Sequence, residues 1–397
     1  MTQTGGEPVS PEIHADGCVT FRLWAPDAPA VSVRNTTGGY ADWPGGNEVP
    51  LPRDGDGLWQ ATIGPLPPEY YTYVFEIGGV PSLDPGNTLY MRDGARYSST
   101  LRVPGSHTVL YDVNPVPHGT LHQVWYASPT LGMDRRMYIY TPPGYERGTE
   151  RYPVLYLLHG GGNDEDGWTS LGRAPQILDN LLAQGLALPM IVVMPNGNGL
   201  LPASPDYVPL PAGWQRPSPG THILRFPDSL VPDVIPFVDE HYRTLTSRED
   251  RAIAGLSMGG AQTMYCAFRN LDHFAWVAVL SGGFPLLPGA AVDIPAPPQA
   301  ERLRGPDITR VVDPGVFTQL IPNLGPEANS RLRLFELQIG TEDGLISTHE
   351  VVKRLLDERG VRYTLRELAG YAHEWRFWRI ALANLAQRLF QPSAGAA

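Results

Sequence analysis

Alternating apolar and polar residues characterise the first quarter of the chain. Val19, Phe21 and Leu23 alternate with residues 20, 22 and 24, and a similar period recurs over 58–63 and 71–77. This spacing is typical of antiparallel strands that bury one face. Turn-forming clusters lie between these segments, at 37–39, 44–46 and 53–57. The pattern predicts a small all-β domain, an immunoglobulin-like sandwich, over residues 17–103.

Short continuous apolar runs replace this alternation from about residue 119 onward. They span 154–158, 190–194, 252–254, 277–280 and 334–339. Runs of this length suit strands that are buried on both faces. Segments with helical spacing lie between them, at 229–242, 259–269, 348–359 and 374–390. The alternation of strands and helices predicts a parallel α/β sheet, which forms a second domain over residues 119–392.

The remaining segments are predicted to be tails, a linker and long loops. Residues 1–16 and 393–397 form the tails, and residues 104–118, which contain Pro104-Gly105, form the linker. Two Pro/Gly-rich stretches interrupt the second domain at 197–227 and 282–329, and loops of this length are usually functional or mobile. Ser347 and Glu350 have the spacing of a capping box, and Gly360 lies where a C-terminal cap belongs.

Composition and charge narrow the classes of partner. The chain carries 30 basic and 41 acidic residues, a net charge of −11, which makes nucleic acid a poor partner. No stretch approaches the roughly 18 apolar residues that a membrane span needs. Cys18 and Cys266 lie in different predicted domains, so no disulfide is indicated. The first 14 residues do not resemble a secretion signal, and we expect a cytoplasmic protein, although a chain whose leader had been removed would look the same.

A G-x-S-x-G motif stands between a predicted strand and a predicted helix, at residues 255–259. In this context a serine on a tight turn projects its hydroxyl above the edge of the sheet, and glycines on either side allow close backbone approach. The N-terminus of the following helix favours developing negative charge. Ser257 is therefore the candidate nucleophile. The alternative is an ordinary Gly-rich turn with a capping serine.

The sequence His-Gly-Gly-Gly at 159–162 directly follows the predicted strand 154–158. This pattern supplies backbone N–H groups that can stabilise an oxyanion. We predict that Met258 and Gly161 or Gly162 donate these N–H groups, and that His159 contacts the substrate. The alternative is a flexible loop between a strand and a helix.

A serine nucleophile needs a base, and in this architecture an acid and then a histidine follow the serine along the chain. His373 lies between a predicted strand and the last helix and is the candidate base. His349 lies on a helix beside the capping box, where a surface position is expected. Asp343 follows the run 334–339 and is the candidate for the acid that orients the imidazole, with Glu342 as the reserve.

Several of these segments together resemble the enterochelin esterase-like, esterase D-type hydrolases, a family that includes the feruloyl esterases of carbohydrate esterase family 1. They are 254–260 with 274–281 downstream, Tyr-Ile-Tyr-Thr-Pro-Pro-Gly-Tyr at 138–145, Gly-Thr-Glu-Asp at 340–343, and His373 with Trp378. The resemblance covers roughly residues 119–390. It implies an α/β-hydrolase fold with Ser257, Asp343 and His373 as the catalytic triad. The run 370–373 departs from the family, which usually places a glycine closer to the histidine.

The first domain resembles, more weakly, the early-set, carbohydrate-binding-type domains that precede some feruloyl esterases and glycogen-branching enzymes. Residues 19–26 and 70–85 carry this resemblance. Such domains often only pack against a catalytic domain. We therefore expect core or interface positions, rather than sugar platforms, for five aromatic residues: Trp24, Trp43, Trp59, Tyr70 and Tyr73.

These observations together predict a serine carboxylic-ester hydrolase that acts on an aryl or sugar-linked ester through an acyl-enzyme. Aromatic residues in or near the loops expected at the sheet's carboxyl edge suit an aromatic acyl group such as feruloyl: Tyr207, Trp214, Phe284, Trp375 and Trp378. Several of them could instead belong to the core, Trp378 above all. No cofactor or metal is implied, because the sequence has neither zinc-ligand spacing nor a phosphate or dinucleotide fingerprint.

Three other functions stay open. A ferric-siderophore esterase would act on strongly anionic substrates, which the net charge of −11 disfavours, although Arg216, Arg225 and Arg376 could form a local basic patch. A glycan-binding protein without activity and an acyltransferase are the others. The natural ester, the role of the first domain and the oligomeric state, a homo-oligomer included, are not decided by the sequence.

Overall fold

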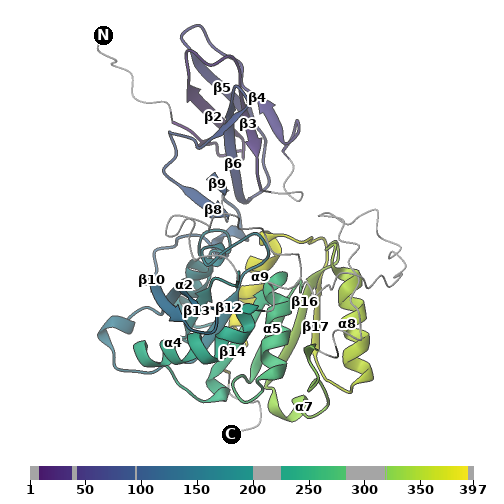
Figure 1. The fold of residues 1–397 in the computed structure, drawn as a ribbon. Helices are drawn as coiled ribbons and strands as arrows, with labels where there is room; N and C mark the ends of the chain where they lie inside the picture. Colours follow the sequence, from purple (N-terminus) through teal and green to yellow (C-terminus); the bar gives the residue numbers. More distant parts are fainter. Residues whose placement is uncertain are drawn as a thin grey trace. The chain divides into compact units, whose positions relative to one another are not determined.

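The structure is a computed structural model that describes residues 9–37, 43–93, 96–199, 225–282, 318 and 320–391 (Figure 1). The chain divides into two compact units, Met1–Val113 and Asn114–Ala397. The division falls within the segment 104–118 that the sequence suggests as a linker. Each unit has its own core and is described separately.

The first unit consists of two antiparallel sheets. One sheet has the strand order β1-β2-β5, and the other has the order β4-β3-β6-β9-β8 with β7 paired to β6. The strands are β1 (Glu12–Ile13), β2 (Val19–Trp24), β3 (Val31–Asn35), β4 (Glu48–Pro50), β5 (Leu58–Ile63), β6 (Glu69–Ile77), β7 (Val80–Ser82), β8 (Tyr90–Asp93) and β9 (Arg96–Val103). The prediction of an all-β first domain is confirmed.

Apolar side chains from both sheets of this unit form one core. The ring of Phe21, on β2, stacks on Trp43 with a centroid distance of 5.3 Å and meets Tyr73, on β6, at 4.9 Å. Trp59 is also buried, and its Nε1–H donates to a backbone carbonyl. Trp24 is 48% exposed at the end of β2 and is not part of the core.

The first unit extends beyond both ends predicted from the sequence. Residues 12–13, which the sequence places in the tail, form β1 and pair with β2. In the predicted linker, residues 108–110 form a short 3-10 helix, and Tyr111 is buried with its hydroxyl donating to Glu69 Oε1 at 2.6 Å. A strand of two residues and a single buried tyrosine have no periodicity, so the hydrophobic pattern could not reveal them.

The second unit is built on one mixed sheet of eight strands, in the order β10-β11-β13-β12-β14-β15-β16-β17 (Figure 1). The strands are β10 (Thr120–Ser128), β11 (Met133–Thr141), β12 (Val154–Leu158), β13 (Ile191–Pro195), β14 (Arg251–Leu256), β15 (Trp276–Leu280), β16 (Leu334–Gly340) and β17 (Thr364–Leu368). The α/β fold class is confirmed. The expectation of a parallel sheet is wrong for β10 and β11, which are antiparallel. Much of β10 is exposed, so it lacks a continuous apolar run.

Helices pack on this sheet as its buried strands require. They are α1 (Gly167–Ser170), α2 (Ala174–Ala183), α3 (Arg225–Ser229), α4 (Ile235–His241), α5 (Met258–Arg269), α7 (Ala328–Arg331), α8 (Ile346–Glu358) and α9 (Trp375–Ala386), with 3-10 turns η2 (Tyr145–Arg147) and η4 (Arg248–Asp250). Both α5 and α9 contact β15; α5 also packs against α3, and α9 against α2. A π-turn, η3 (Leu230–Val234), interrupts the helix expected over 229–242. Pro232 and Pro236 lie here, and proline cannot donate a helical hydrogen bond.

Helix α8 begins earlier than the sequence suggests. Its N-cap position is Leu345, so Ser347 lies inside the helix and the predicted capping box with Glu350 is wrong. The chain already turns at Asp343, whose carboxylate accepts a hydrogen bond from the Leu345 N–H at 2.8 Å. Because of this start, His349 is 1% exposed, and its expected surface position is also wrong. Gly360 follows the helix with φ of +65°, as expected of a C-terminal cap.

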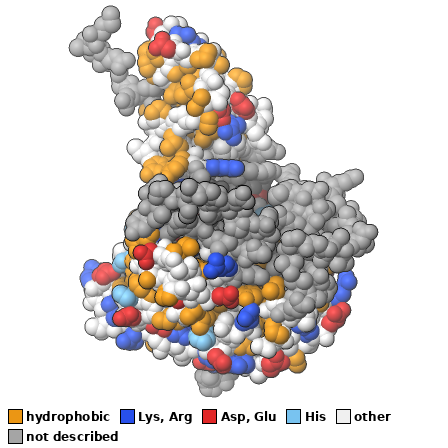
Figure 2. Space-filling view, viewed as in Figure 1, with side chains coloured by type: hydrophobic (Ala, Val, Ile, Leu, Met, Phe, Trp, Pro, Cys, Tyr) orange, Lys and Arg blue, Asp and Glu red, His pale blue; other side chains and the backbone are white. Residues whose placement is uncertain are grey.

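The surface of the described residues carries no extended field of one charge sign on the face drawn in Figure 2, where acidic and basic side chains are interspersed. Within the described ranges, no helix is both long and apolar enough to cross a membrane.

The order of the central strands creates a topological switch point between β12 and β14. The chain passes from β12 to β13 on one side and later returns to β14 on the other side. Connections that leave the carboxyl ends of neighbouring strands in opposite directions open a crevice where α/β proteins bind ligands. Residues 159–162 follow β12, and Ser257 follows β14, so both predicted motifs lie at this point.

Candidate active site

Ser257 occupies a sharp turn between β14 and α5. Its φ of 51° and ψ of −114° lie in a region that residues other than glycine seldom adopt. Hydrogen bonds hold the turn on both sides: the Ser257 N–H donates to Leu280 O of β15 at 3.0 Å, and the Gly260 N–H donates to Ser257 O at 3.0 Å. A strained conformation persists only where its surroundings determine it in this way, and such strain concentrates at functional sites.

The two glycines of the motif have a steric role. A Cβ atom on Gly259 would lie 2.6 Å from the carbonyl oxygens of both Leu158 and His159, and one on Gly255 would clash with Gly259 O. Real Cβ atoms do not approach oxygen this closely. Glycine therefore allows α5 to begin directly above β14 and against the end of β12, and this close approach holds Ser257 at the edge of the sheet.

The structure brings together the three residues that the sequence singled out as nucleophile, base and acid. Nε2 of His373 lies 2.9 Å from Ser257 Oγ. Nδ1 of His373 lies 3.2 and 3.1 Å from the two carboxylate oxygens of Asp343. Because a carboxylate can only accept, Nδ1 carries the proton, and Nε2 is free to accept one from the serine hydroxyl.

Asp343 is fully buried, and its charge is maintained by its neighbours. Burial by itself would raise the pKa of the carboxyl group. The adjacent His373 and the Leu345 N–H act in the opposite direction and hold the pKa of Asp343 below its usual value. The carboxyl group is therefore ionised at neutral pH. The N–H of Glu342, the reserve candidate, donates to Tyr371 O at 2.9 Å.

The glycine loop after β12 lies against the turn at Ser257. A Cβ atom on Gly160 would lie 2.5 Å from Leu256 Cδ1 and 3.3 Å from Ser257 Cβ. Gly161 and Gly162 are exposed, and a Cβ atom on Gly161 would lie 4.0 Å from Met258 Cβ. Met258 is the first residue of α5, so its N–H has no acceptor inside the helix. Of the predicted N–H donors, Met258 thus directly follows the serine and Gly161 lies near Met258.

His159 does not have the position that the sequence suggests for it. Its side chain is 1% exposed, and both ring nitrogens are used within the protein. Nε2 accepts a hydrogen bond from the Gly197 N–H at 2.8 Å, so Nδ1 donates to Gly160 O at 2.8 Å. Burial also lowers the pKa of His159, which keeps the ring neutral. The residue connects two loops and is not available to contact a substrate.

Three tryptophan side chains form a row of ring contacts that begins at His373. The indole of Trp378 is perpendicular to the imidazole of His373 at 4.9 Å, and Trp375 is perpendicular to Trp378 at 5.2 Å and to Trp168 at 5.3 Å. Trp378 and Trp168 are buried, whereas Trp375 is only partly buried. Trp378 is thus a core residue. The other proposed substrate contacts, Trp214 and Phe284, lie outside the described residues, as do Tyr207 and Arg216.

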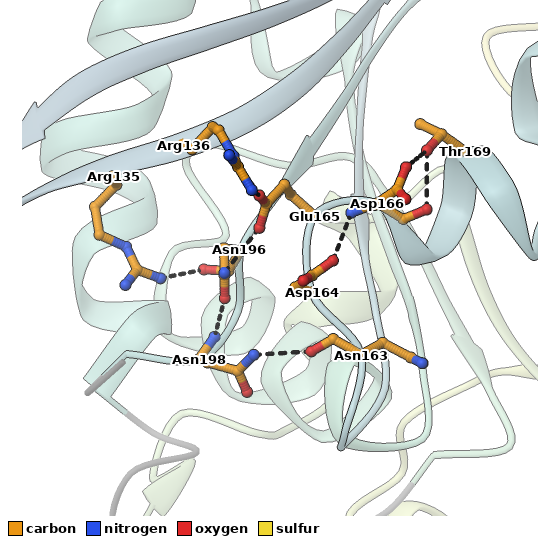
Figure 3. A network of polar contacts seen from close by, with 9 residues as sticks. All are labelled: Arg135, Arg136, Asn163, Asp164, Glu165, Asp166, Thr169, Asn196 and Asn198. Atoms are coloured by element: carbon orange, nitrogen blue, oxygen red, sulfur yellow. Dashed lines mark hydrogen bonds and ion pairs between the residues drawn. The ribbon is translucent and has the colours of Figure 1, made fainter. Parts of the chain in front are cut away.

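A buried polar network behind the glycine loop was missed by the sequence analysis (Figure 3). Glu165 forms an ion pair with Arg136 of β11, and its Oε2 accepts a hydrogen bond from Asn196 Nδ2 at 2.8 Å. Burial and the charge of Asp164 raise the pKa of Glu165, and Arg136 opposes both. The sequence did contain a signal, because polar runs follow two buried strands: Asn-Asp-Glu-Asp at 163–166, after the glycines that follow β12, and Asn-Gly-Asn at 196–198, directly after β13.

Comparison with known proteins gives this arrangement a family context. The family model "Putative esterase" matches residues 128–290. The chain is 30% identical over 402 residues to an endo-1,4-beta-xylanase/feruloyl esterase of Xylanibacter ruminicola, an alignment that covers 98% of this chain and 47% of the relative. The matched residues of the family model lie wholly within the second unit. An esterase of Mycobacterium tuberculosis is 28% identical over 167 residues, which is 40% of this chain and 32% of that protein.

The chain spans about half the length of the first of these curated relatives and about a third of the second. Among solved structures, the enterobactin esterase of Shigella flexneri, in the presence of enterobactin, is similar over 94% of this chain and 93% of its own, with 18% identity and a TM-score of 0.61. A ferulic acid esterase of Anaeromyces mucronatus, in complex with ferulic acid, is similar over 72% of this chain and 96% of its own, with 21% identity and a TM-score of 0.54. These similarities confirm the α/β-hydrolase fold of the second unit.

Among the described residues of both units, no group of three His, Cys, Asp or Glu side chains could hold a metal ion.

Proposed function

We propose that the protein is a serine carboxylic-ester hydrolase in which Ser257 is the nucleophile, His373 the base and Asp343 the orienting acid. The observation that carries this proposal is the continuous chain of contacts from Ser257 Oγ to His373 Nε2, at 2.9 Å, and from His373 Nδ1 to Asp343. A serine hydroxyl is a weak nucleophile until a base within hydrogen-bond reach takes its proton. Here the base is in reach and its own orientation is fixed by a buried carboxylate.

The reaction proceeds in two halves. His373 takes the Ser257 proton while Oγ bonds to the ester carbonyl carbon, and the carbonyl oxygen becomes an oxyanion. The bond to the leaving oxygen then breaks, and the protonated His373 delivers its proton to the departing alcohol, which leaves an acyl-enzyme. In the second half His373 takes a proton from water, the water oxygen attacks the acyl carbon, and Ser257 recovers its proton as the acid departs.

The oxyanion needs donors that are already in place before the reaction. The N–H groups of Met258 and of Gly161 or Gly162 are proposed for this role because Met258 directly follows Ser257, Gly161 lies near Met258, and Gly160, one residue earlier, lies against Ser257. The N-terminus of α5 adds a favourable partial charge at the same point.

An aryl or sugar-linked ester is the proposed substrate class. The partly buried Trp375, which packs on Trp168 and Trp378, offers an aromatic surface close to His373. A planar aromatic acyl group would pack on such a surface. The relative from Xylanibacter ruminicola, whose name includes feruloyl esterase, supports this choice.

A ferric-siderophore ester is the second candidate, because the similarity to the enterobactin esterase extends over both units. Such a substrate carries several negative charges. The net charge of −11 and the interspersed charges in Figure 2 offer it no basic surface among the described residues on that face. The aryl ester is therefore the preferred class.

The test compares the purified wild-type protein with Ser257→Ala on p-nitrophenyl esters, methyl ferulate, acetylated sugars and a catecholate siderophore ester. We expect turnover by the wild type and a loss of at least about 10⁴-fold in Ser257→Ala with an unchanged circular dichroism spectrum. Ser330→Ala, on the short helix α7, is the matched control and should retain full activity. Turnover that survives in Ser257→Ala would refute the mechanism, and a preference for the siderophore ester would replace the substrate class.

A further inference from the structure

Hydrogen bonds join two loops that follow neighbouring strands, β12 and β13. The side chains that form these bonds contact no reacting atom. One loop, 159–166, follows β12 and carries Gly161 and Gly162; the other, 196–199, follows β13. Three hydrogen bonds join them: the Gly197 N–H to His159 Nε2 at 2.8 Å, Asn198 Nδ2 to Asn163 O at 2.8 Å, and Asn196 Nδ2 to Glu165 Oε2 at 2.8 Å. The glycine loop is thus fixed both at its start and at its end.

Asn196 is the centre of this connection (Figure 3). Its side-chain oxygen accepts a hydrogen bond from the Asn198 N–H at 2.9 Å, and its backbone oxygen accepts one from Arg135 Nη2 at 2.6 Å. Asn196 and Arg135 are both buried, at 2% and 0% exposure. From α5, Gln262 Nε2 adds a bond of 2.9 Å to Gly197 O. The second loop is therefore a rigid support and not a free segment.

Glu165 connects the glycine loop, residues 159–166, to this second loop. Its carboxylate is fully buried and uses both oxygens, Oε1 toward the guanidinium of Arg136 and Oε2 toward Asn196. Arg136 is on β11, which pairs with β13, so the carboxylate is held by the sheet itself. A buried charge is stable only with such partners, and removal of one partner leaves the other charge uncompensated. Glu165 thus fixes the backbone only three residues after Gly162.

We propose that Glu165 is a positioning residue for the oxyanion donors: its bonds to Arg136 and Asn196 hold the loop 159–166 so that the N–H groups of Gly161 and Gly162 stay beside Ser257. This inference rests on the proposed function, because it concerns the same site. Oxyanion donors work only when they are held within a fraction of an ångström of the developing charge. The loop itself is exposed at Gly161 and Gly162, so its position has to come from the network underneath.

The test uses Glu165→Gln in the full-length protein. Glutamine keeps an acceptor for Asn196 but loses the ion pair with Arg136. We expect kcat for a p-nitrophenyl ester to fall about 10-fold to 100-fold while KM changes less than about 2-fold, since misplacement of a catalytic group by about 1 Å costs up to 10²-fold. Affinity for an aryl boronic acid, which forms a tetrahedral adduct with the serine, should fall by a similar factor. Amide hydrogen exchange should accelerate in 159–166 and 196–199.

Glu336→Gln is the matched control. Glu336, on β16, is equally buried and pairs with two arginines, Arg366 and Arg388, but it takes no part in the two loops. We expect this variant to lose stability while it keeps kcat and the exchange rates of both loops. If lower stability alone reduced kcat, both variants would lose activity. A positioning effect lowers kcat and accelerates loop exchange only in Glu165→Gln.

Asn198→Ala gives a second, milder variant, because it removes only the bond to Asn163 O. It should lower kcat about 3-fold to 10-fold with little change in KM, and it keeps the test valid if Glu165→Gln does not fold. Wild-type kcat in both variants, or unchanged loop exchange, would overturn the positioning role while the esterase proposal stood. Absence of ester turnover in the wild type itself would overturn both, and would be seen before any variant was made.

Discussion

The indole of Trp378 meets the imidazole of His373 at a right angle, with the ring centres 4.9 Å apart and the planes at 89°. The contact joins the first helical turn of α9 to the loop that carries the histidine. This packing limits the orientations that the imidazole can adopt beside the serine.

Replacement of Trp378 should therefore impair the reaction more than substrate binding. We expect Trp378→Leu to lower kcat about 10-fold with a small change in KM, because a flexible aliphatic side chain allows the imidazole more orientations. Trp378→Phe, which keeps an aromatic ring, should retain most of the activity. Steady-state kinetics of both variants on one p-nitrophenyl ester test this, and equal losses in the two variants would contradict it.

Asp343→Asn should nearly abolish turnover without unfolding the protein. An amide can present its NH₂ group to His373 Nδ1, which favours the wrong tautomer and leaves Nε2 protonated and unable to accept the serine proton. We expect a loss in kcat of about 10⁴-fold. Glu342→Gln, one residue earlier, should stay near wild-type activity. If Glu342→Gln were the inactive variant instead, the acid would have been assigned to the wrong residue.

Gly259→Ala should destabilise the second unit. The added methyl group would lie 2.6 Å from two carbonyl oxygens at the end of β12, and no flexible side chain can move out of its way. Overpacking of this kind costs about 1–3 kcal/mol or more, which urea denaturation would detect. Gly161→Ala is the matched control for stability, because its methyl group would have no atom closer than 4.0 Å. Similar stability of the two variants would contradict the steric argument.

The buried His349 should make the protein less stable in mild acid. Burial lowers the pKa of His349 from 6.5 to about 4, and His373 and Lys353 act in the same direction while Asp343 opposes them. Its proton is therefore bound more readily in the unfolded chain, so stability falls as the pH drops below 6.5. The loss is about 1.4 kcal/mol per pH unit, or about 2 kcal/mol at pH 5.

His349→Gln isolates this contribution, because glutamine does not titrate. The variant should show a smaller decrease in the free energy of unfolding between pH 7.5 and pH 5 than the wild type, as measured by urea denaturation. His118→Gln provides a control, since that histidine is 49% exposed at its side chain and pairs with Asp179. Identical pH dependence in wild type and His349→Gln would show that the folded and unfolded states bind this proton equally, which would contradict a lowered pKa for His349.

Predictions of strands and turns from the sequence were most accurate where one physical requirement acts on neighbouring residues. The run 154–158 corresponds to β12 residue for residue, because a strand buried on both faces must be apolar throughout. Gly255, Ser257 and Gly259 could be located because the turn itself requires them. The hairpin of β10 and β11 was not predicted, since its exposed and half-buried residues have no continuous apolar run.

Errors arose where a polar residue's position depends on distant segments. His159 was expected to face a substrate, but its partner Gly197 lies 38 residues further along the chain. Glu165 pairs with Arg136 on another strand, 29 residues earlier. His349 was expected at the surface because the start of α8 was placed at Ser347 rather than after Leu345. In each case the local pattern is compatible with exposure, and only the tertiary fold buries the side chain.

The ion pair between Arg136 and Glu165 also bears on self-association. β10 is the outermost strand of the sheet, and an edge strand can pair with another molecule through its free backbone groups. Its Trp125 is 41% exposed, and the guanidinium of Arg136 lies over this ring at 5.5 Å. The planar guanidinium of Arg136 thus stacks on Trp125 and at the same time pairs with the buried carboxylate of Glu165. The single ammonium of a lysine would make both contacts poorly. We therefore expect loss of Arg136 to promote aggregation and also to disturb the position of the glycine loop.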